Sequence, residues 1–172
     1  KAWMAPPGVG VIAVSKKAWA AHATSTMPKF YFDIAKYRQF LEIGQPPFTP
    51  ALGPIYGLDL ALQQLIDEGI ENVIARHAAL AEQTRAGIKR LGLSLFCDER
   101  VSSNTVTAIR VPEGVDGGRV SARMRDELDV EISGGQGPLA GKIWRIGHMG
   151  WCLPEHIDDC IDALEATLAE EK

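Results

Sequence analysis

The sequence predicts an α/β protein whose two parts differ in character. After residue 50, stretches with helical spacing of apolar residues alternate with short β-branched runs, which predicts a small α+β domain with helices on one face of a sheet. Before residue 51, the chain offers one short strand, two short helices and a proline-rich loop, which are too little for a sheet of their own. We therefore interpret residues 1–50 as the tail of a larger domain. Residues 51–172 are interpreted as a linker helix followed by the small domain.

The first part contains few regular elements. Residues 9–14 form an apolar run that predicts a buried strand, whose neighbours would have to lie elsewhere because a single strand cannot pair alone. Helices are expected over residues 16–23, with Ser15 as a cap, and over residues 31–43, with Gly44 as the stop. The segment GQPPFTPALGP has four prolines in eleven residues, so we expect an ordered loop there.

The second part alternates between the two periods of secondary structure. Apolar residues recur at three- and four-residue spacing and predict helices over residues 56–68, 70–91, 119–128 and 154–171. Alternating or β-branched runs predict strands over residues 93–97, 105–111, 130–132 and 143–147. The glycine-rich segment SGGQGPLAGK lacks the G-x-x-x-x-G-K-[ST] pattern of a phosphate loop, which favours a turn between two strands.

Composition excludes several classes of protein. The chain is 46% hydrophobic and 23% charged with a net charge of −4, so it has no basic footprint for nucleic acid. No apolar run reaches the ~18–20 residues that cross a bilayer, so we expect no membrane span. The three cysteines, Cys97, Cys152 and Cys160, form no C-x-x-C pair, which favours small buried thiols in a reduced, cytoplasmic protein. No histidine lies at ligand spacing from another, so no metal site is expected.

Two charged residues stand in apolar surroundings. A lysine amine becomes a useful nucleophile when its environment desolvates it, and the segment that follows Lys1, AWMAPPG, is apolar and stiff. A frayed, charged terminus is the alternative. Arg145 lies in an apolar strand, where its planar fork suits bidentate capture of a carboxylate or phosphate. The alternative is an arginine that points outward from an edge strand.

Two further residues allow both a functional and a structural interpretation. His148 could orient a substrate group, or it could be a hydrogen-bonded structural residue. Thr49 offers a hydroxyl on a stiff backbone, which suits a phosphate and equally suits a turn.

Five motifs, in this order and spacing, resemble the C-terminal half of a class V aminotransferase: KAWMAPPG, PKFYFDI, GQPPFTPA, NTVTAIRVPEGVD and ISGGQGPLAGKIWRIGHMG. The most similar group is that of the alanine–glyoxylate and serine–pyruvate (or serine–glyoxylate) aminotransferases, which are pyridoxal 5'-phosphate enzymes of fold type I. The resemblance covers essentially the whole chain. It implies that the fold is the C-terminal part of a fold type I PLP-dependent transferase, and that the enzyme is a homodimer.

The resemblance also implies roles for individual residues. The family's lysine before A-x-x-x-P-P-G bonds to the cofactor, and this lysine is Lys1 here, so the chain is expected to begin at the catalytic lysine of a longer enzyme. The family's R-I-G arginine, here Arg145, holds the substrate carboxylate. Thr49 matches a hydroxyl that reaches the cofactor phosphate of the neighbouring subunit. Pro46 stands where relatives often place a further tyrosine or threonine hydroxyl.

The activity implied is transamination between a small amino acid, alanine or serine, and a 2-oxo acid, glyoxylate or pyruvate. The aromatic residue that stacks on the cofactor ring and the aspartate that pairs with its nitrogen belong to the family's N-terminal half. We therefore expect that half as a missing partner, and the 172 residues alone to be inactive. Two alternatives stay open. One is a cysteine desulfurase-like enzyme, which needs an exposed, low-pKa cysteine. The other is a non-catalytic accessory subunit of a soluble hydrogenase, a name that some close relatives carry.

Overall fold

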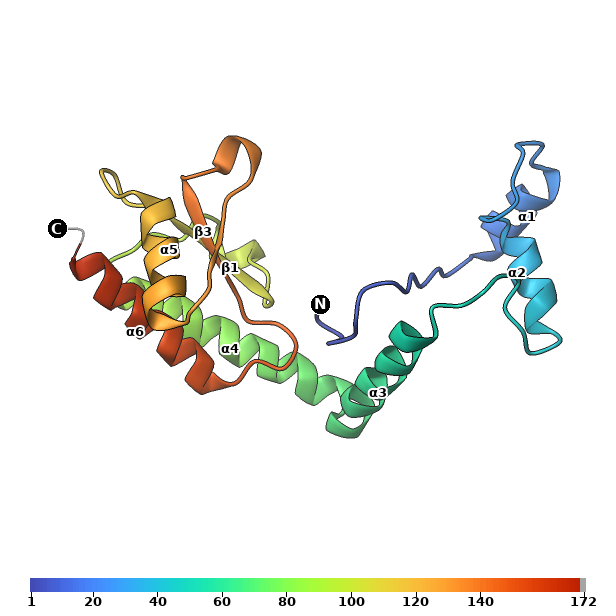
Figure 1. The fold of residues 1–172 in the computed structure, drawn as a ribbon, viewed down its shortest axis with the longest axis horizontal. Helices are drawn as coiled ribbons and strands as arrows, with labels where there is room; N and C mark the ends of the chain where they lie inside the picture. Colours follow the sequence, from blue (N-terminus) through green and yellow to red (C-terminus); the bar gives the residue numbers. More distant parts are fainter. Residues whose placement is uncertain (171–172) are drawn as a thin grey trace. The chain divides into compact units, whose positions relative to one another are not determined.

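The computed structural model describes residues 1–170, which form two compact units (Figure 1). One unit comprises Ala5–Leu60, and the other joins Lys1–Met4 to the chain from Ala61 onward. The chain order is α1 (Lys16–Thr24), α2 (Ile34–Leu41), α3 (Leu52–Glu68), α4 (Ile70–Arg90), η1 (Glu99–Val101), β1 (Val106–Arg110), α5 (Gly117–Leu128), β2 (Ser133–Gly134), η2 (Gly137–Leu139), β3 (Ile143–Gly147) and α6 (Pro154–Ala169). The assignment of residues 1–50 to the tail of a larger domain stays a prediction.

In the Ala5–Leu60 unit, two capped helices match the sequence pattern. The Ser15 hydroxyl accepts a hydrogen bond from Ala18 N–H at the start of α1, as expected. Helix α2 is shorter than the expected span of residues 31–43. It begins at Ile34 because the Asp33 carboxylate caps it, accepting a hydrogen bond from the Ala35 amide. Asp33 also contacts His22 Nε2 at 2.9 Å, which ties α2 to α1.

Two expectations for this unit are wrong. Residues 9–14 have no regular secondary structure, and Val11 and Ile12 are 68% and 75% exposed. This apolar run has no partner strand among the described residues, so its backbone cannot form a ladder. The proline-rich loop is also shorter than expected because α3 already begins at Leu52. Pro54 is compatible with this start because the first turn of a helix needs no N–H donor there.

The other unit contains a three-stranded antiparallel sheet in the order β1-β3-β2. The expected strand over residues 143–147 is β3, and it lies in the centre. The expected strand over residues 130–132 is wrong, because the short pairing segment is β2 one residue later. The expected strand over residues 93–97 reduces to a single bridge between Leu95 and Ile109.

One face of this sheet and three helices share the hydrophobic core. Ile109 of β1 and Trp144 and Ile146 of β3 are buried on that face, while Arg145 between the last two points to the opposite face. Helices α4, α5 and α6 supply most of the rest of the core, with α6 packed against both other helices (Figure 1). The predicted sheet with helices on one face is therefore confirmed. Within residues 1–170, no helix is long and apolar enough to cross a membrane.

Candidate active site

Lys1 begins a tight turn that leaves its side chain exposed. The Met4 amide donates a 2.9 Å hydrogen bond to the Lys1 carbonyl, and Met4 has a φ of +61°, a conformation that non-glycine residues seldom adopt. This turn contacts Gly150, whose φ is +74°. A Cβ at Gly150 would lie 3.1 Å from Met4 Cγ and 3.3 Å from the Lys1 carbonyl oxygen. Position 150 therefore requires glycine both for its backbone conformation and for this close approach.

Arg145 lies in the central strand on the face opposite the core. Its cross-strand partners are Ala108 of β1 and Ser133 of β2. The guanidinium uses Nε to donate a 2.9 Å hydrogen bond to the Gly134 carbonyl. Among the described residues, its two terminal nitrogens have no hydrogen-bond partner. The guanidinium is therefore held at Nε, while its two terminal nitrogens are available for a ligand. This arrangement suits bidentate binding of a carboxylate.

The structure brings the lysine turn and the arginine segment into one unit. Gly150, which the Lys1 turn contacts, follows Arg145 by five residues in the segment RIGHMG. Thr49 belongs to the Ala5–Leu60 unit, where its hydroxyl is exposed in the loop between α2 and α3. The neighbouring Phe48 packs against the rings of Phe30 and Tyr31, so the loop is held from one side.

His148 has a structural environment. It is fully buried, Nε2 lies 2.9 Å from the Thr107 hydroxyl and Nδ1 lies 3.2 Å from the Asn104 carbonyl. The carbonyl can only accept, so Nδ1 carries the proton and Nε2 accepts from Thr107. Burial is the main reason that the pKa of His148 lies below its ordinary value. Of the two interpretations of this histidine, the geometry favours the structural one.

Helix α4 contributes two contacts to Gly150 that the sequence did not reveal. The Gly150 amide donates to His77 Nε2 at 3.1 Å, and the Gly150 carbonyl accepts from Arg76 Nη1 at 2.8 Å. In the sequence, His77 lies on the apolar stripe of the helix. A buried histidine needs hydrogen-bond partners, which was the available signal. Its partner lies 73 residues away, so spacing could not identify it.

Comparison with known proteins identifies relatives of the chain. No protein-family model matches it. The chain is 40% identical over 170 residues to a protein named soluble hydrogenase, small subunit, from a Synechococcus strain, covering 99% of this chain and 44% of that protein. It is 36% identical over 173 residues to serine–glyoxylate aminotransferase of Arabidopsis thaliana, covering 99% of this chain and 43% of that protein. The crystal structure of an alanine–glyoxylate aminotransferase from Nostoc sp. superposes with a TM-score of 0.84 at 31% identity, covering 90% of this chain and 42% of that one.

The chain is related to the class V aminotransferases. Its described fold corresponds to part of these PLP-dependent transferases, which confirms the predicted fold class. The chain spans less than half the length of the curated relatives it matches.

The three cysteines differ in their surroundings. The expectation of small buried thiols is wrong for Cys97, which is exposed, and Cys152 is half-buried. Burial raises the pKa of Cys152, and it raises the pKa of the buried Cys160 to about 11. Cys97 lines a cavity of about 250 Å³ beside β1, whose wall includes Arg85, Val101 and Ala108 but neither Lys1 nor Arg145.

Among residues 1–170, no group of three or more histidine, cysteine, aspartate or glutamate side chains is arranged to hold a metal ion.

Proposed function

We propose that this chain is part of a pyridoxal 5'-phosphate-dependent aminotransferase that exchanges the amino group of a small amino acid with a 2-oxo acid. The observation that carries the proposal is the contact between the Lys1 turn and Gly150, at the end of the segment that begins with Arg145. This contact places the turn that carries an exposed primary amine against the loop that follows β3, the strand that bears Arg145. The reaction requires an amine that can bond to the cofactor aldehyde and a guanidinium that can bind the substrate carboxylate. Lys1 and Arg145 offer these two groups.

Lys1 has two proposed tasks. Its Nζ would hold the cofactor through the aldehyde group when the cofactor is bound. The same amine would act as the general base that takes the proton from the substrate Cα, and then as the acid that gives it back. The cofactor, when bound, supplies the electron sink that makes this Cα–H bond acidic. An exposed side chain on a short, contact-held turn is compatible with both tasks, because the amine must move between two positions.

Arg145 has the proposed task of holding the substrate carboxylate. Its Nε is engaged by the Gly134 carbonyl, so the guanidinium plane is fixed before substrate binds. The terminal nitrogens then determine where the carboxylate lies, and thereby the direction of the Cα–H bond. Preorganisation of this kind lowers the cost of orienting the substrate.

Thr49 is proposed to bind the cofactor phosphate across a homodimer. Its exposed hydroxyl on a proline-rich loop supports this role. Pro46, three residues earlier, has no side-chain donor, so this loop offers one hydroxyl at these two positions. The remaining groups around the cofactor are proposed to come from the part of the enzyme that corresponds to the other half of the relatives.

For the amino donor we propose alanine or serine, and for the acceptor glyoxylate or pyruvate. The names of the Arabidopsis and Nostoc relatives, which specify serine, alanine and glyoxylate, support this choice. A desulfurase would need a reactive thiolate close to Lys1, whereas burial disfavours thiolates at Cys152 and Cys160 and Cys97 lines a cavity without Lys1. The name of the Synechococcus relative makes an accessory role in a soluble hydrogenase the second candidate. Transamination is preferred because it assigns a task to both Lys1 and Arg145.

The test replaces Lys1 by alanine in the full-length enzyme, with Lys16→Ala as a matched control at an exposed lysine of α1. We expect Lys1→Ala to reduce transamination by at least about 10²-fold, since it removes the general acid–base group. Borohydride reduction of the wild type should fix the cofactor on the Lys1 peptide, as detected by mass spectrometry. Persistence of transamination in Lys1→Ala, or fixation on another peptide, would refute the proposal.

A further inference from the structure

We propose that Arg76 and His77 of helix α4 are positioning residues for Lys1, and that they act by fixing both polar backbone groups of Gly150. The inference rests on the function proposed for Lys1. It extends that function to two residues that contact neither the cofactor nor the substrate in the scheme above.

His77 fixes the amide of Gly150. Its ring is buried, with 7% of the residue exposed, and Nδ1 lies 2.7 Å from the Val73 carbonyl. A carbonyl only accepts, so Nδ1 must carry the proton, and Nε2 of the neutral ring is then an acceptor. This acceptor receives the Gly150 N–H at 3.1 Å. The contact with α4's own backbone therefore sets the tautomer that holds Gly150.

Arg76 fixes the carbonyl of the same residue. Its Nη1 donates to the Gly150 oxygen at 2.8 Å. Its Nε and Nη2 bind the two oxygens of Glu68 at 2.7 and 2.9 Å, a bidentate pair that orients the guanidinium plane. Hydrogen bonding to Arg76 also lowers the pKa of the Glu68 carboxyl, so this anchor stays ionised at neutral pH.

Gly150 passes this constraint to the Lys1 turn. Its left-handed backbone brings it within van der Waals reach of Met4 and of the Lys1 carbonyl. Met4 itself holds a positive φ, and a non-glycine residue keeps such a conformation only where its surroundings enforce it. Arg76 and His77, which are adjacent on α4, thus bind the carbonyl and the amide of Gly150. Gly150 in turn supports the strained turn that carries the Lys1 amine.

The experiment uses the full-length enzyme and compares four variants. His77→Leu removes the acceptor, whereas His77→Gln offers an amide oxygen close to the place of Nε2. Arg76→Met removes the donor to Gly150 at a side chain that is 23% exposed, so it disturbs the core less. Thr84→Val is the matched control. Thr84 is fully buried on the same helix and its hydroxyl donates to the Leu80 carbonyl at 2.7 Å, with no bond to Gly150.

Two measurements separate positioning from stability. In the cofactor-free protein, hydrogen–deuterium exchange of the Gly150 amide should be at least about tenfold faster in His77→Leu, because its acceptor is gone. In the loaded enzyme, the pH midpoint of the cofactor absorbance should shift in His77→Leu and Arg76→Met, and kcat should fall about tenfold while KM stays within about twofold. His77→Gln should restore most of the wild-type behaviour. Thr84→Val should change neither the exchange at Gly150 nor the absorbance midpoint.

The outcomes distinguish the two proposals. If the wild type carries no covalent cofactor on Lys1, the proposed function fails and the positioning role fails with it. If Lys1 carries the cofactor but both His77→Leu and Arg76→Met behave like Thr84→Val, the positioning role alone is wrong. If His77→Leu does not fold, Arg76→Met decides by the same criteria.

Discussion

Arg145 combines a charge with an apolar sequence context, and the structure corrects one detail of the two interpretations that the sequence left open, because its strand β3 is central and not at an edge. It points to the sheet face opposite the core, as strand alternation predicted, and its Nε is bound to the Gly134 carbonyl. An outward arginine and a carboxylate-binding arginine are therefore compatible, since the fixed base leaves the tip of the fork for a ligand. The structure describes this geometry, and the binding role remains a prediction.

Replacing Arg145 by lysine tests that role. Lysine keeps the positive charge but cannot form two parallel hydrogen bonds to one carboxylate. Loss of a charged hydrogen bond costs about 1.5–3 kcal/mol, so we expect KM for the amino acid to rise about tenfold or more in the full-length enzyme. The matched control is Arg110→Lys on β1, an exposed arginine that stacks on Phe96. A wild-type KM in Arg145→Lys would mean that another group holds the carboxylate.

His148 provides a prediction on pH. Its pKa is lowered in the folded protein, mainly by burial, from the ordinary value of 6.5. The unfolded chain therefore binds more protons between the folded pKa and 6.5, so stability rises with pH across that window and is lost as pH falls through it. We expect the free energy of unfolding, followed by intrinsic tryptophan fluorescence, to be lower at about pH 5.5 than at about pH 7.5. His148→Gln should flatten this dependence, and an unchanged slope would contradict the assignment.

Among the elements, helices were predicted well because a 3.6-residue apolar stripe is a local signal. The expected helix over residues 70–91 is α4 almost to the residue, and Gly92, with a φ of +73°, follows its end. Strands were predicted well where two of them pair over five residues: the expected strand over residues 105–111 is β1, and that over residues 143–147 is β3. The runs at residues 9–14 and 93–97 have strand composition, but pairing depends on partners that are distant in sequence or outside the described residues.

The packing of α4 on α6 gives a prediction at the scale of elements. A Cβ at Gly87 would lie 2.8 Å from Cγ1 of Ile161, which is buried on α6. Gly87→Ala should therefore lower the free energy of unfolding by about 1–3 kcal/mol, because the two helices must move apart. Gly53→Ala in α3 is the control, since nothing lies within 4 Å of its added Cβ and alanine favours a helix. Urea denaturation measures both, and equal stability of the two variants would contradict this packing.

For the molecule as a whole, burial differs between the two units of the structure, whereas the predicted domain boundary after residue 50 stays a prediction. Every core residue lies between Ala61 and Thr167, whereas none of residues 5–60 is buried. The candidate site could be predicted only in part. Lys1 and Arg145 are conspicuous as charges in apolar segments, while the contacts of α4 with Gly150 depend on a chain reversal that no local pattern encodes.

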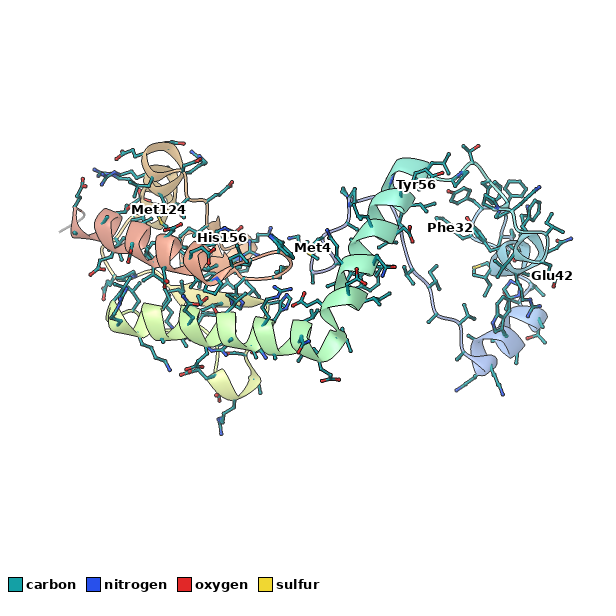
Figure 2. The ribbon with its side chains drawn as sticks, turned by 90° about the horizontal axis from the view of Figure 1, so that it is seen from below. Met4, Phe32, Glu42, Tyr56, Met124 and His156 are labelled. Carbon is teal, nitrogen blue, oxygen red and sulfur yellow. The ribbon has the colours of Figure 1, made fainter. Side chains whose placement is uncertain are left out.

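This division leads to a prediction for the 172-residue chain. The Ala5–Leu60 unit exposes large apolar side chains such as Phe32, 84% exposed and labelled in Figure 2, and has no buried residue to resist opening. Its backbone should open locally at a low free-energy cost, so proteases should cleave it first. We expect limited proteolysis to remove residues between 5 and 60 and to leave a resistant fragment that starts near Ala61, identified by mass spectrometry.

In the full-length enzyme the same sites should be protected, if the exposed apolar side chains are covered by the rest of the protein. The prediction would be wrong if the first cleavage fell within α4 or α6, or if both units of the 172-residue chain were equally resistant. Either result would mean that the unit with the buried core is no more stable than the Ala5–Leu60 unit.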